Sequence, residues 1–146
     1  MNKTAHLELD PVPGGTGLRF RVHTDSGIAY HLDSGEGAKD PSPVDVLLAS
    51  LAGCTGMDVI FILRKKRLDV TGYTLEVTGQ RRDDHPRGYT AMEVVHRVRG
   101  RGVPRAAVEE AVRLSEEKYC SVHFTLAPAV KLTSRIEVEE ESAIPG

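Results

Sequence analysis

The stretch from Pro43 to Arg67 is the feature that most constrains how this chain can fold. Between Val46 and Leu63 its only charged side chain is Asp58. A helix that is apolar around its whole circumference is usually buried on every side. A chain of 146 residues is short for supplying that much cover by itself. The sequence therefore predicts a long, buried central helix, covered in part by a partner subunit.

Both ends of this helix carry the residues that helix ends favour. Ser42 can act as the N-cap, Pro43 suits the first helical position, and Asp45 completes an arrangement like a capping box. The basic run 64–67 falls in the last turn, where cations interact favourably with the helix dipole. Asp45 is therefore interpreted first as a helix-start residue.

Alternation of apolar and polar residues predicts strands at 5–9, 17–23 and 28–32 before the helix, and at 73–82, 89–99 and 130–140 after it. A second, amphipathic helix is predicted from Pro104 to Tyr119, and segment 121–127 is ambiguous. The order β-β-β-α-β-β-α-β indicates an α+β protein. We expect a single domain over residues 1–146, with loose ends at 1–4 and 141–146.

Composition and charge exclude several classes of function. The net charge of −2 and the absence of a long basic run argue against nucleic-acid binding. The N-terminus lacks the apolar core of a signal peptide. Asp58, Gly53 and Gly56 interrupt the apolar run, which argues against a membrane span. We expect a cytoplasmic protein that binds neither nucleic acid nor a membrane.

Two cysteines, Cys54 and Cys120, are the main candidates for chemistry. The six histidines do not have the close spacing of a zinc motif, and no phosphate-binding or hydrolase motif is present, so neither a metal nor another cofactor is expected. In a reducing compartment the two thiols are more often reactive or simply packed than joined permanently. Because Cys54 lies about three turns inside its helix, its activation would need an external cation or hydrogen-bond donor.

The stretches 42–59 (SPVDVLLASLAGCTGMDV) and 114–126 (LSEEKYCSVHFTL) resemble the OsmC/Ohr superfamily. The resemblance includes the element order and the separation of the cysteines, and it covers nearly the whole chain. Segments 62–67 (ILRKKR), 78–90 (TGQRRDDHPRGYT) and 115–122 (SEEKYCSV) resemble its YhfA-like branch. The resemblance implies an OsmC-like fold and an intertwined homodimer with both central helices buried between two sheets.

The same resemblance implies thiol-dependent reduction of organic hydroperoxides. Cys54 matches the peroxidatic cysteine, which forms a sulfenic acid, and Cys120 matches the resolving cysteine, which closes a disulfide. An external dithiol reductant would then restore both thiols. The implied partners are a small organic hydroperoxide, a dithiol and a second copy of the chain.

One position departs from the superfamily pattern. Its peroxidases carry a Glu after the proline that matches Pro43, whereas this chain has Val44 there and its carboxylate at Asp45. A helix turns about 100° per residue, so Asp45 cannot simply point in the same direction. Those enzymes also use an arginine from the N-terminal region. Arg19 and Arg21 are the candidates, and a solvated strand face is the alternative for both.

Three more residues are supporting candidates. Asp58 follows Cys54 by one turn, and a carboxylate in an apolar helix needs a cation or a hydrogen-bond donor. Glu117 could tune Cys120, or belong only to a solvated helix end. His123 could share a helical face with Cys120 and exchange a proton with it.

The sequence leaves two further interpretations open beside the peroxidase. The chain could be a non-peroxidatic dimeric relative that acts as a thiol redox sensor or binds a small ligand. Alternatively, both cysteines could only fill space in the core.

Overall fold

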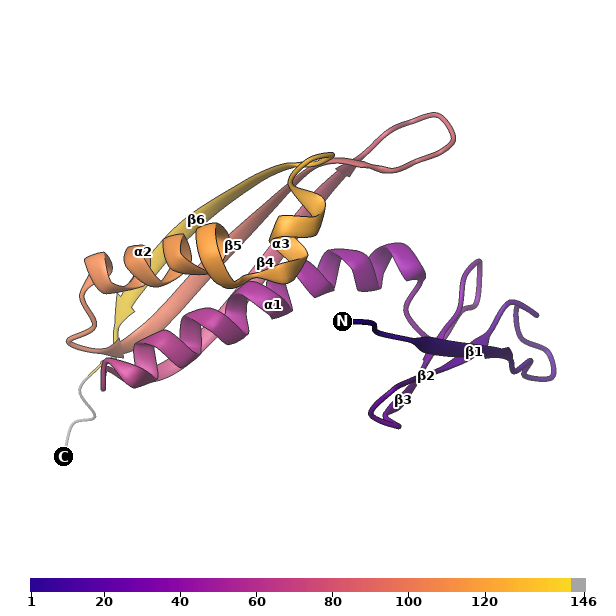
Figure 1. The fold of residues 1–146 in the computed structure, drawn as a ribbon, viewed down its shortest axis with the longest axis horizontal. Helices are drawn as coiled ribbons and strands as arrows, with labels where there is room; N and C mark the ends of the chain where they lie inside the picture. Colours follow the sequence, from indigo (N-terminus) through magenta and orange to yellow (C-terminus); the bar gives the residue numbers. More distant parts are fainter. Residues whose placement is uncertain (143–146) are drawn as a thin grey trace. The chain divides into compact units, whose positions relative to one another are not determined.

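The computed structural model describes residues 1–142, and the chain forms two compact units (Figure 1). The N-terminal unit is Met1–Leu47, and the C-terminal unit begins at Leu48. The described elements are β1 (Ala5–Leu9), β2 (Phe20–Thr24), β3 (Ala29–Leu32), α1 (Pro43–Lys65), β4 (Asp69–Arg81), β5 (Tyr89–Arg101), α2 (Arg105–Leu114), the π-helix η1 (Ser115–Tyr119), α3 (Ser121–Leu126) and β6 (Lys131–Glu140).

The N-terminal unit holds an antiparallel sheet with the strand order β1-β2-β3. Val22 on β2 is buried, whereas all of β1 is exposed. The loop before α1 is held by Asp33, which is 6% exposed and accepts hydrogen bonds from the hydroxyl of Thr16 and the amide of Ser34. These bonds fix the loop that leads to the start of α1.

Helix α1 begins with the capping box that its sequence predicts. The amide of Asp45 donates to Ser42 Oγ at 3.2 Å, and the amide of Ser42 donates to Asp45 Oδ2 at 3.3 Å. By length and composition alone α1 could cross a membrane, a criterion that core helices of soluble proteins also meet. Its buried residues form one stripe: Leu51, Ala52, Thr55, Gly56, Val59 and Leu63.

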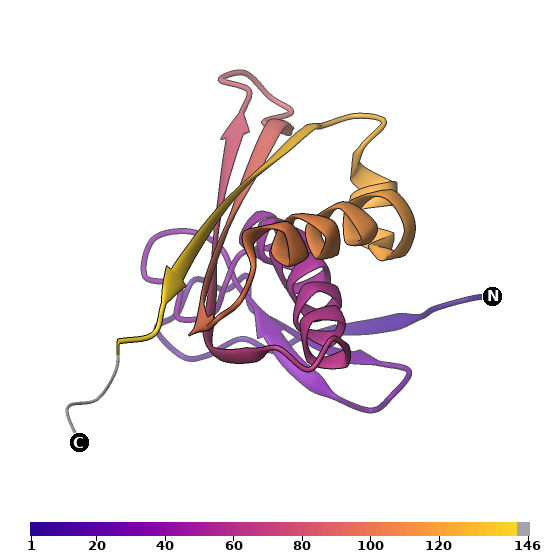
Figure 2. The ribbon, with the colours of Figure 1, turned by 90° about the vertical axis from the view of Figure 1, so that its left-hand side faces the viewer.

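The C-terminal unit is built on a sheet with the order β4-β5-β6, in which β5 pairs antiparallel with β4 and parallel with β6. Figure 2 shows α1 and α2 on the same side of this sheet. Two apolar clusters lie between them. One joins Val59 and Leu63 of α1 to Val98 of β5 and to α2, and the other joins Leu51 to Met92. The buried stripe of α1 therefore anchors the whole unit.

Within a single chain, α1 is not buried on every side as its apolarity predicts. Met57 is 73% exposed and Phe61, one turn later, is 66% exposed. The residues that the chain itself covers are those that contact β4, β5 and α2. The face of α1 that carries these two side chains is thus left without cover from residues 1–142.

The predicted α+β architecture is confirmed, with local differences from the predicted elements. Segment 121–127, ambiguous in the sequence, contains the short helix α3. Strand β4 begins at Asp69 and β5 reaches Arg101, so both are longer than predicted. At the C-terminal end, the amide of Glu141 donates to the carbonyl of Gly100, and residues 143–146 lie outside the described part.

A buried polar pair lies inside the sheet of the C-terminal unit. His96 is fully buried, and its Nδ1 lies 2.6 Å from the hydroxyl of Tyr73. Within residues 1–142, His96 Nε2 has no hydrogen-bond partner. Burial disfavours the imidazolium and lowers the pKa of His96 to about 4. His96 is therefore a neutral core residue at physiological pH.

We expect the protein to lose stability as the pH falls from about 6.5 to about 4. The unfolded chain binds a proton at His96 with a pKa of about 6.5, whereas the folded chain resists protonation until about pH 4. The free energy of unfolding should fall by about 3 kcal/mol across this window through His96 alone. His96→Asn, which keeps an acceptor for Tyr73, should flatten the pH dependence measured by urea unfolding. Equal slopes for the two proteins would contradict this assignment.

Gly100→Ala should lower the free energy of unfolding by about 1–3 kcal/mol. A Cβ at Gly100 would overlap the backbone carbonyl oxygen of Asp69, and backbone atoms cannot rotate away. Gly72→Ala is the matched control in the paired strand, because a Cβ there would approach nothing closer than 3.8 Å. Thermal and urea unfolding measure both effects, and equal stabilities for the two variants would refute this reading of the backbone contact.

Candidate functional site

Two thiols and a carboxylate that are far apart in the sequence meet in the C-terminal unit. The sulfurs of Cys54 and Cys120 and a carboxylate oxygen of Asp58 lie within 4.8 Å of one another. Both cysteines are free thiols. Cys120 is 3% exposed, whereas Cys54 and Asp58 are half-buried. The cluster is therefore more open to solvent at Cys54 and Asp58 than at Cys120.

Helix α1 supplies two of these groups from one face. Cys54 and Asp58 are four residues apart, so their side chains lie one turn from each other. They flank the buried stripe, in which Thr55 and Val59 are the nearest members. The packing that fixes this stripe against the sheet also fixes the direction of the thiol and the carboxylate.

Cys120 is placed by a change in helix type. After α2 the chain widens into η1, and the amide of Cys120 donates to the carbonyl of Ser115, five residues back, at 2.8 Å. Cys120 then has an extended backbone and acts as the N-cap of α3, where its sulfur accepts from the amide of His123 at 3.3 Å. The thiol thus lies at the junction of two helical segments and points toward α1.

Two buried hydroxyl groups tie the cluster together. Thr55 Oγ1 donates to Cys120 Sγ at 3.5 Å, and Ser115 Oγ donates to Asp58 Oδ2 at 2.8 Å. Sequence reasoning missed both residues. The signal for Ser115 was available, since it is a polar residue in the apolar stripe of the second helix. The donor that Asp58 was expected to need is therefore a serine hydroxyl.

The surroundings of Cys120 disfavour its thiolate. Burial raises the pKa of Cys120, and the hydrogen bond and the charge of Cys54 raise it further. The hydrogen bonds from Thr55 and from the amide of His123 act in the opposite direction and lower the pKa. Desolvation is the largest of these effects, so Cys120 is held as a thiol next to its partner sulfur.

The remaining candidates in the C-terminal unit have other surroundings. Glu117 is exposed and lies 3.5 Å from Arg113, four residues earlier on the helical segment. His123 contributes its backbone amide to Cys120, and its half-buried ring makes no described hydrogen bond in residues 1–142. The structure thus gives Glu117 a surface ion pair and gives His123 a backbone contact in place of the expected side-chain one.

The candidates in the N-terminal unit also have structural partners. Asp45 closes the capping box with Ser42. Arg19 contacts Asp40 at 2.8 Å and Asp10 at 3.1 Å. Arg21 is exposed on β2. Arg19 therefore sits in a network of carboxylates that sequence reasoning did not foresee.

Two hollows border the cluster. A groove lined by Phe61, Ile62, Leu114 and Tyr119 ends at Asp58 and Lys65. A second hollow leads to Cys120 along residues 116–121 and Phe124. The first is mostly apolar with one charged group of each sign, so it suits a small molecule with an apolar part.

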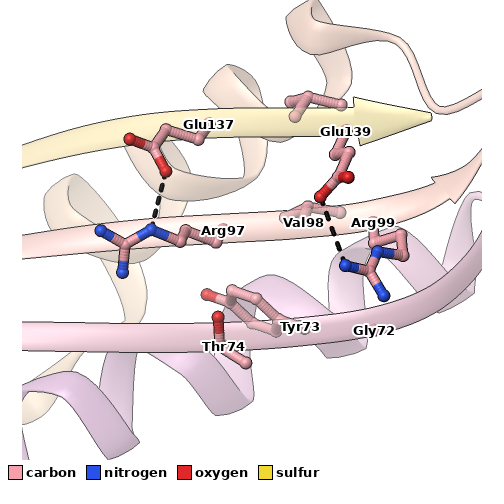
Figure 3. Close-up of a pocket in the computed structure, with 9 residues that line it drawn as sticks. Gly72, Tyr73, Thr74, Arg97, Val98, Arg99, Glu137 and Glu139 are labelled. Atoms are coloured by element: carbon pink, nitrogen blue, oxygen red, sulfur yellow. Dashed lines mark hydrogen bonds and ion pairs between the residues drawn. The ribbon is translucent and has the colours of Figure 1, made fainter. Parts of the chain in front are cut away.

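A third hollow lies on the sheet and carries no comparable chemistry (Figure 3). It is bordered by two ion pairs, Arg97 with Glu137 at 2.7 Å and Arg99 with Glu139 at 3.4 Å. These four side chains are largely exposed, and such surface pairs contribute little to stability because water screens them. None of its lining residues is a cysteine or a histidine, so the thiol cluster remains the candidate site.

Comparisons with known proteins agree with the fold. The family model described as OsmC-like protein matches residues 35–135. Protein YhfA of Escherichia coli K12 is 41% identical over 122 residues, which cover 84% of this chain and 91% of YhfA. Both cysteines and Asp58 lie within the matched region of the family model.

Solved structures show the same architecture. A hypothetical protein from Aquifex aeolicus VF5 is 34% identical, with a TM-score of 0.83 over 97% of this chain and 99% of that one. The organic hydroperoxide resistance protein OhrB of Bacillus subtilis is 14% identical, with a TM-score of 0.61 over 94% of this chain and 98% of that one, a likeness of fold alone. With the family match over residues 35–135 and the identity to YhfA, this chain belongs to the OsmC-like family.

Proposed function

We propose that this protein is a thiol-dependent peroxidase that reduces small organic hydroperoxides through Cys54 and Cys120. The observation that carries the proposal is the approach of the two free sulfurs to within 4.8 Å, from segments 66 residues apart. A disulfide has a sulfur–sulfur distance of about 2 Å, so rotation of the two side chains covers much of the remaining gap. The name of OhrB, an organic hydroperoxide resistance protein of the same fold, suggests the substrate class.

The reaction has three balanced steps. The Cys54 thiolate attacks the outer oxygen of the hydroperoxide, the O–O bond breaks, and the alcohol leaves with a proton while Cys54 becomes a sulfenic acid. The Cys120 thiol then attacks the Cys54 sulfur, which forms the disulfide and releases water. An external dithiol finally reduces the disulfide and is itself oxidised to a disulfide.

The burial of the two thiols favours this assignment of roles. Cys54 is half-exposed and can meet a peroxide, whereas Cys120 is 3% exposed and cannot easily do so first. Burial also raises the pKa of Cys120, which keeps it protonated until a sulfenic acid forms beside it. A buried thiol beside an accessible one is suited to resolving the intermediate rather than to making it.

The adjacent groove supports an organic substrate over hydrogen peroxide. Phe61, Ile62, Leu114 and Tyr119 offer apolar surface, and Asp58 connects the groove to the thiols. An apolar substituent bound there would be removed from water and held near Cys54. Because Val44 stands where related peroxidases carry Glu, the activation of Cys54 would rely on groups other than that carboxylate.

We also propose that the protein acts as a cytoplasmic homodimer formed through the exposed face of α1. Met57 is 73% exposed and Phe61 is 66% exposed, and both project from a helix that is otherwise apolar. Large apolar side chains grouped on one helix face are unfavourable in water and typical of an interface. A second copy is the partner that would cover the face that the chain itself leaves open, and a reducing cytoplasm would maintain the free thiols.

The peroxidase proposal predicts distinct phenotypes for the two cysteines. Wild-type protein should consume cumene hydroperoxide in the presence of dithiothreitol. Cys54→Ser should lower the rate by at least about 100-fold, because a serine hydroxyl is not ionised at neutral pH. Cys120→Ser should react once and stop at a sulfenic acid that dimedone traps. Stopped-flow peroxide assays and mass spectrometry provide the two readouts.

Met92→Leu, which removes a buried sulfur of the same unit and conserves volume, is the control and should retain full turnover. Stoichiometric oxidation of Cys54 without turnover would instead identify a redox sensor. A Cys54 that stays reduced with one equivalent of peroxide would refute the enzymatic proposal.

The dimer proposal predicts that Phe61→Asp raises the dimer dissociation constant by at least about 100-fold, since a charge would be buried at the interface. Sedimentation velocity over a concentration series measures the constant. Thr133→Asp places the same charge on the exposed outer face of β6 and should leave the dimer intact. A wild-type protein that sediments as a monomer at micromolar concentration would disprove the proposal.

A further inference from the structure

We propose that Cys54, Asp58 and Cys120 form a binding site for a thiophilic divalent cation, with Zn²⁺ as the best fit. The two sulfurs and the carboxylate oxygen already converge within 4.8 Å of one another. The site shares its side chains with the proposed peroxidase but does not need that activity. The sequence contains no pattern of closely spaced ligands that would predict this metal site.

The distances are close to those of a tetrahedral site. With metal–sulfur bonds of about 2.3 Å and metal–oxygen bonds of about 2.0 Å, donor atoms around a tetrahedral zinc lie roughly 3.5–3.8 Å apart. Donor atoms that are at most 4.8 Å apart need to move inward by about 1 Å or less each. Small rotations of the Cys54 and Asp58 side chains on α1 would provide this movement without a change in the backbone.

The carboxylate of Asp58 lacks the cation that a half-buried charge calls for. Within residues 1–142 it takes part in no salt bridge, and Ser115 Oγ is its one described hydrogen-bond donor. That bond, to Oδ2 at 2.8 Å, leaves Oδ1 available as a ligand. A hydroxyl that holds a carboxylate in this way is the usual outer support of a metal ligand. The buried Ser115 thus preorients Asp58 toward the two sulfurs.

The donor set selects the class of metal. Two thiolates and one carboxylate match the preferences of zinc, whereas calcium and magnesium require oxygen ligands alone. Three protein ligands leave a fourth position for water or a small thiol. Binding would displace one proton from each thiol into solvent, so the bound site would carry three ligand charges against the two of the metal.

Electrostatics and access both favour a cation here. Two thiolates and a carboxylate within 4.8 Å of one another in a partly buried cluster would repel one another. A divalent ion between them would turn this repulsion into attraction. The half-exposed Cys54 provides an entry path from solvent.

Metal binding and thiol oxidation would exclude each other. A sulfur bonded to zinc has its lone pair engaged, and two sulfurs bridged by a metal cannot approach to form a disulfide. Zinc would therefore hold the pair reduced and inactive, and oxidation of the pair by an organic hydroperoxide, which is reduced to its alcohol and water, would form the disulfide and release zinc. The consequence is a site in which the redox state and the metal content are reciprocally linked.

The test uses reduced, metal-free, full-length protein in the absence of peroxide. Co²⁺ serves as the spectroscopic probe, and Zn²⁺ affinity is measured by competition with a chromophoric chelator. We expect one metal per chain, a thiolate-to-cobalt charge-transfer band, and tetrahedral ligand-field bands. Asp58→Asn should weaken Zn²⁺ binding by at least tenfold, and Cys120→Ser should remove most of the charge-transfer intensity. Glu109→Gln, which removes an exposed carboxylate of the same unit, should change neither.

Zn²⁺ at one equivalent should also slow alkylation of Cys54 at least tenfold, with recovery on addition of a chelator. Equal Zn²⁺ affinity for Asp58→Asn and wild type, a stoichiometry of one metal for two chains, or no charge-transfer band would overturn the proposal. Cys120→Ser provides a second test should Asp58→Asn fail to fold. Because these readouts involve no peroxide, a protein that binds zinc without turnover, or turns over without binding zinc, separates this inference from the peroxidase.

Discussion

The close contact of α1 with the sheet at Gly56 is the interaction on which the C-terminal unit depends. A Cβ at this position would lie 2.9 Å from Cδ1 of Leu75, so a larger residue would require the Leu75 side chain on β4 to move. With glycine there, the helix approaches closely enough for Leu51 to reach Met92 and for Val59 to reach Val98, on either side of the contact. The thiol and carboxylate of the site lie within one turn of Gly56, and their positions follow from this contact.

Much of this fold could be predicted from the sequence because its signals are local. The capping residues Ser42 and Asp45 mark the start of α1, and the alternation of side chains marks the strands. The parallel pairing of β5 with β6 could not be read this way, since it depends on a return path through α2, η1 and α3. The exposed face of α1 could not be predicted either. The apolarity of the helix indicates that it is covered, but does not show which of its faces the chain itself covers.

The sequence predicts which residues belong to the site, but it does not predict how they are arranged in space. The positions of Cys54 and Cys120 stand out in the sequence, and i,i+4 spacing places Asp58 near Cys54. The proximity of Cys54, Asp58 and Cys120 depends on long-range contacts, because the packing of α1 and the path of η1 determine it. The roles expected for Arg19 and Asp45 were inferred from a resemblance, whereas the structure surrounds Arg19 with carboxylates and ties Asp45 into the helix cap.

The position of Cys120 depends on the π-helix Ser115–Tyr119 that precedes it. Its wider turn, closed by the bond from the Cys120 amide to the Ser115 carbonyl, holds one more residue than an α-helical turn would. The direction of the thiol therefore depends on the number of residues in this turn as well as on their chemistry. If the same residues continued as a regular α-helix, the turn would close one residue earlier and Cys120 would point roughly 100° away from its present direction. In evolution, the pairing of the two sulfurs could thus be lost through substitutions that convert this turn into a regular helix, with every residue of the cluster still present.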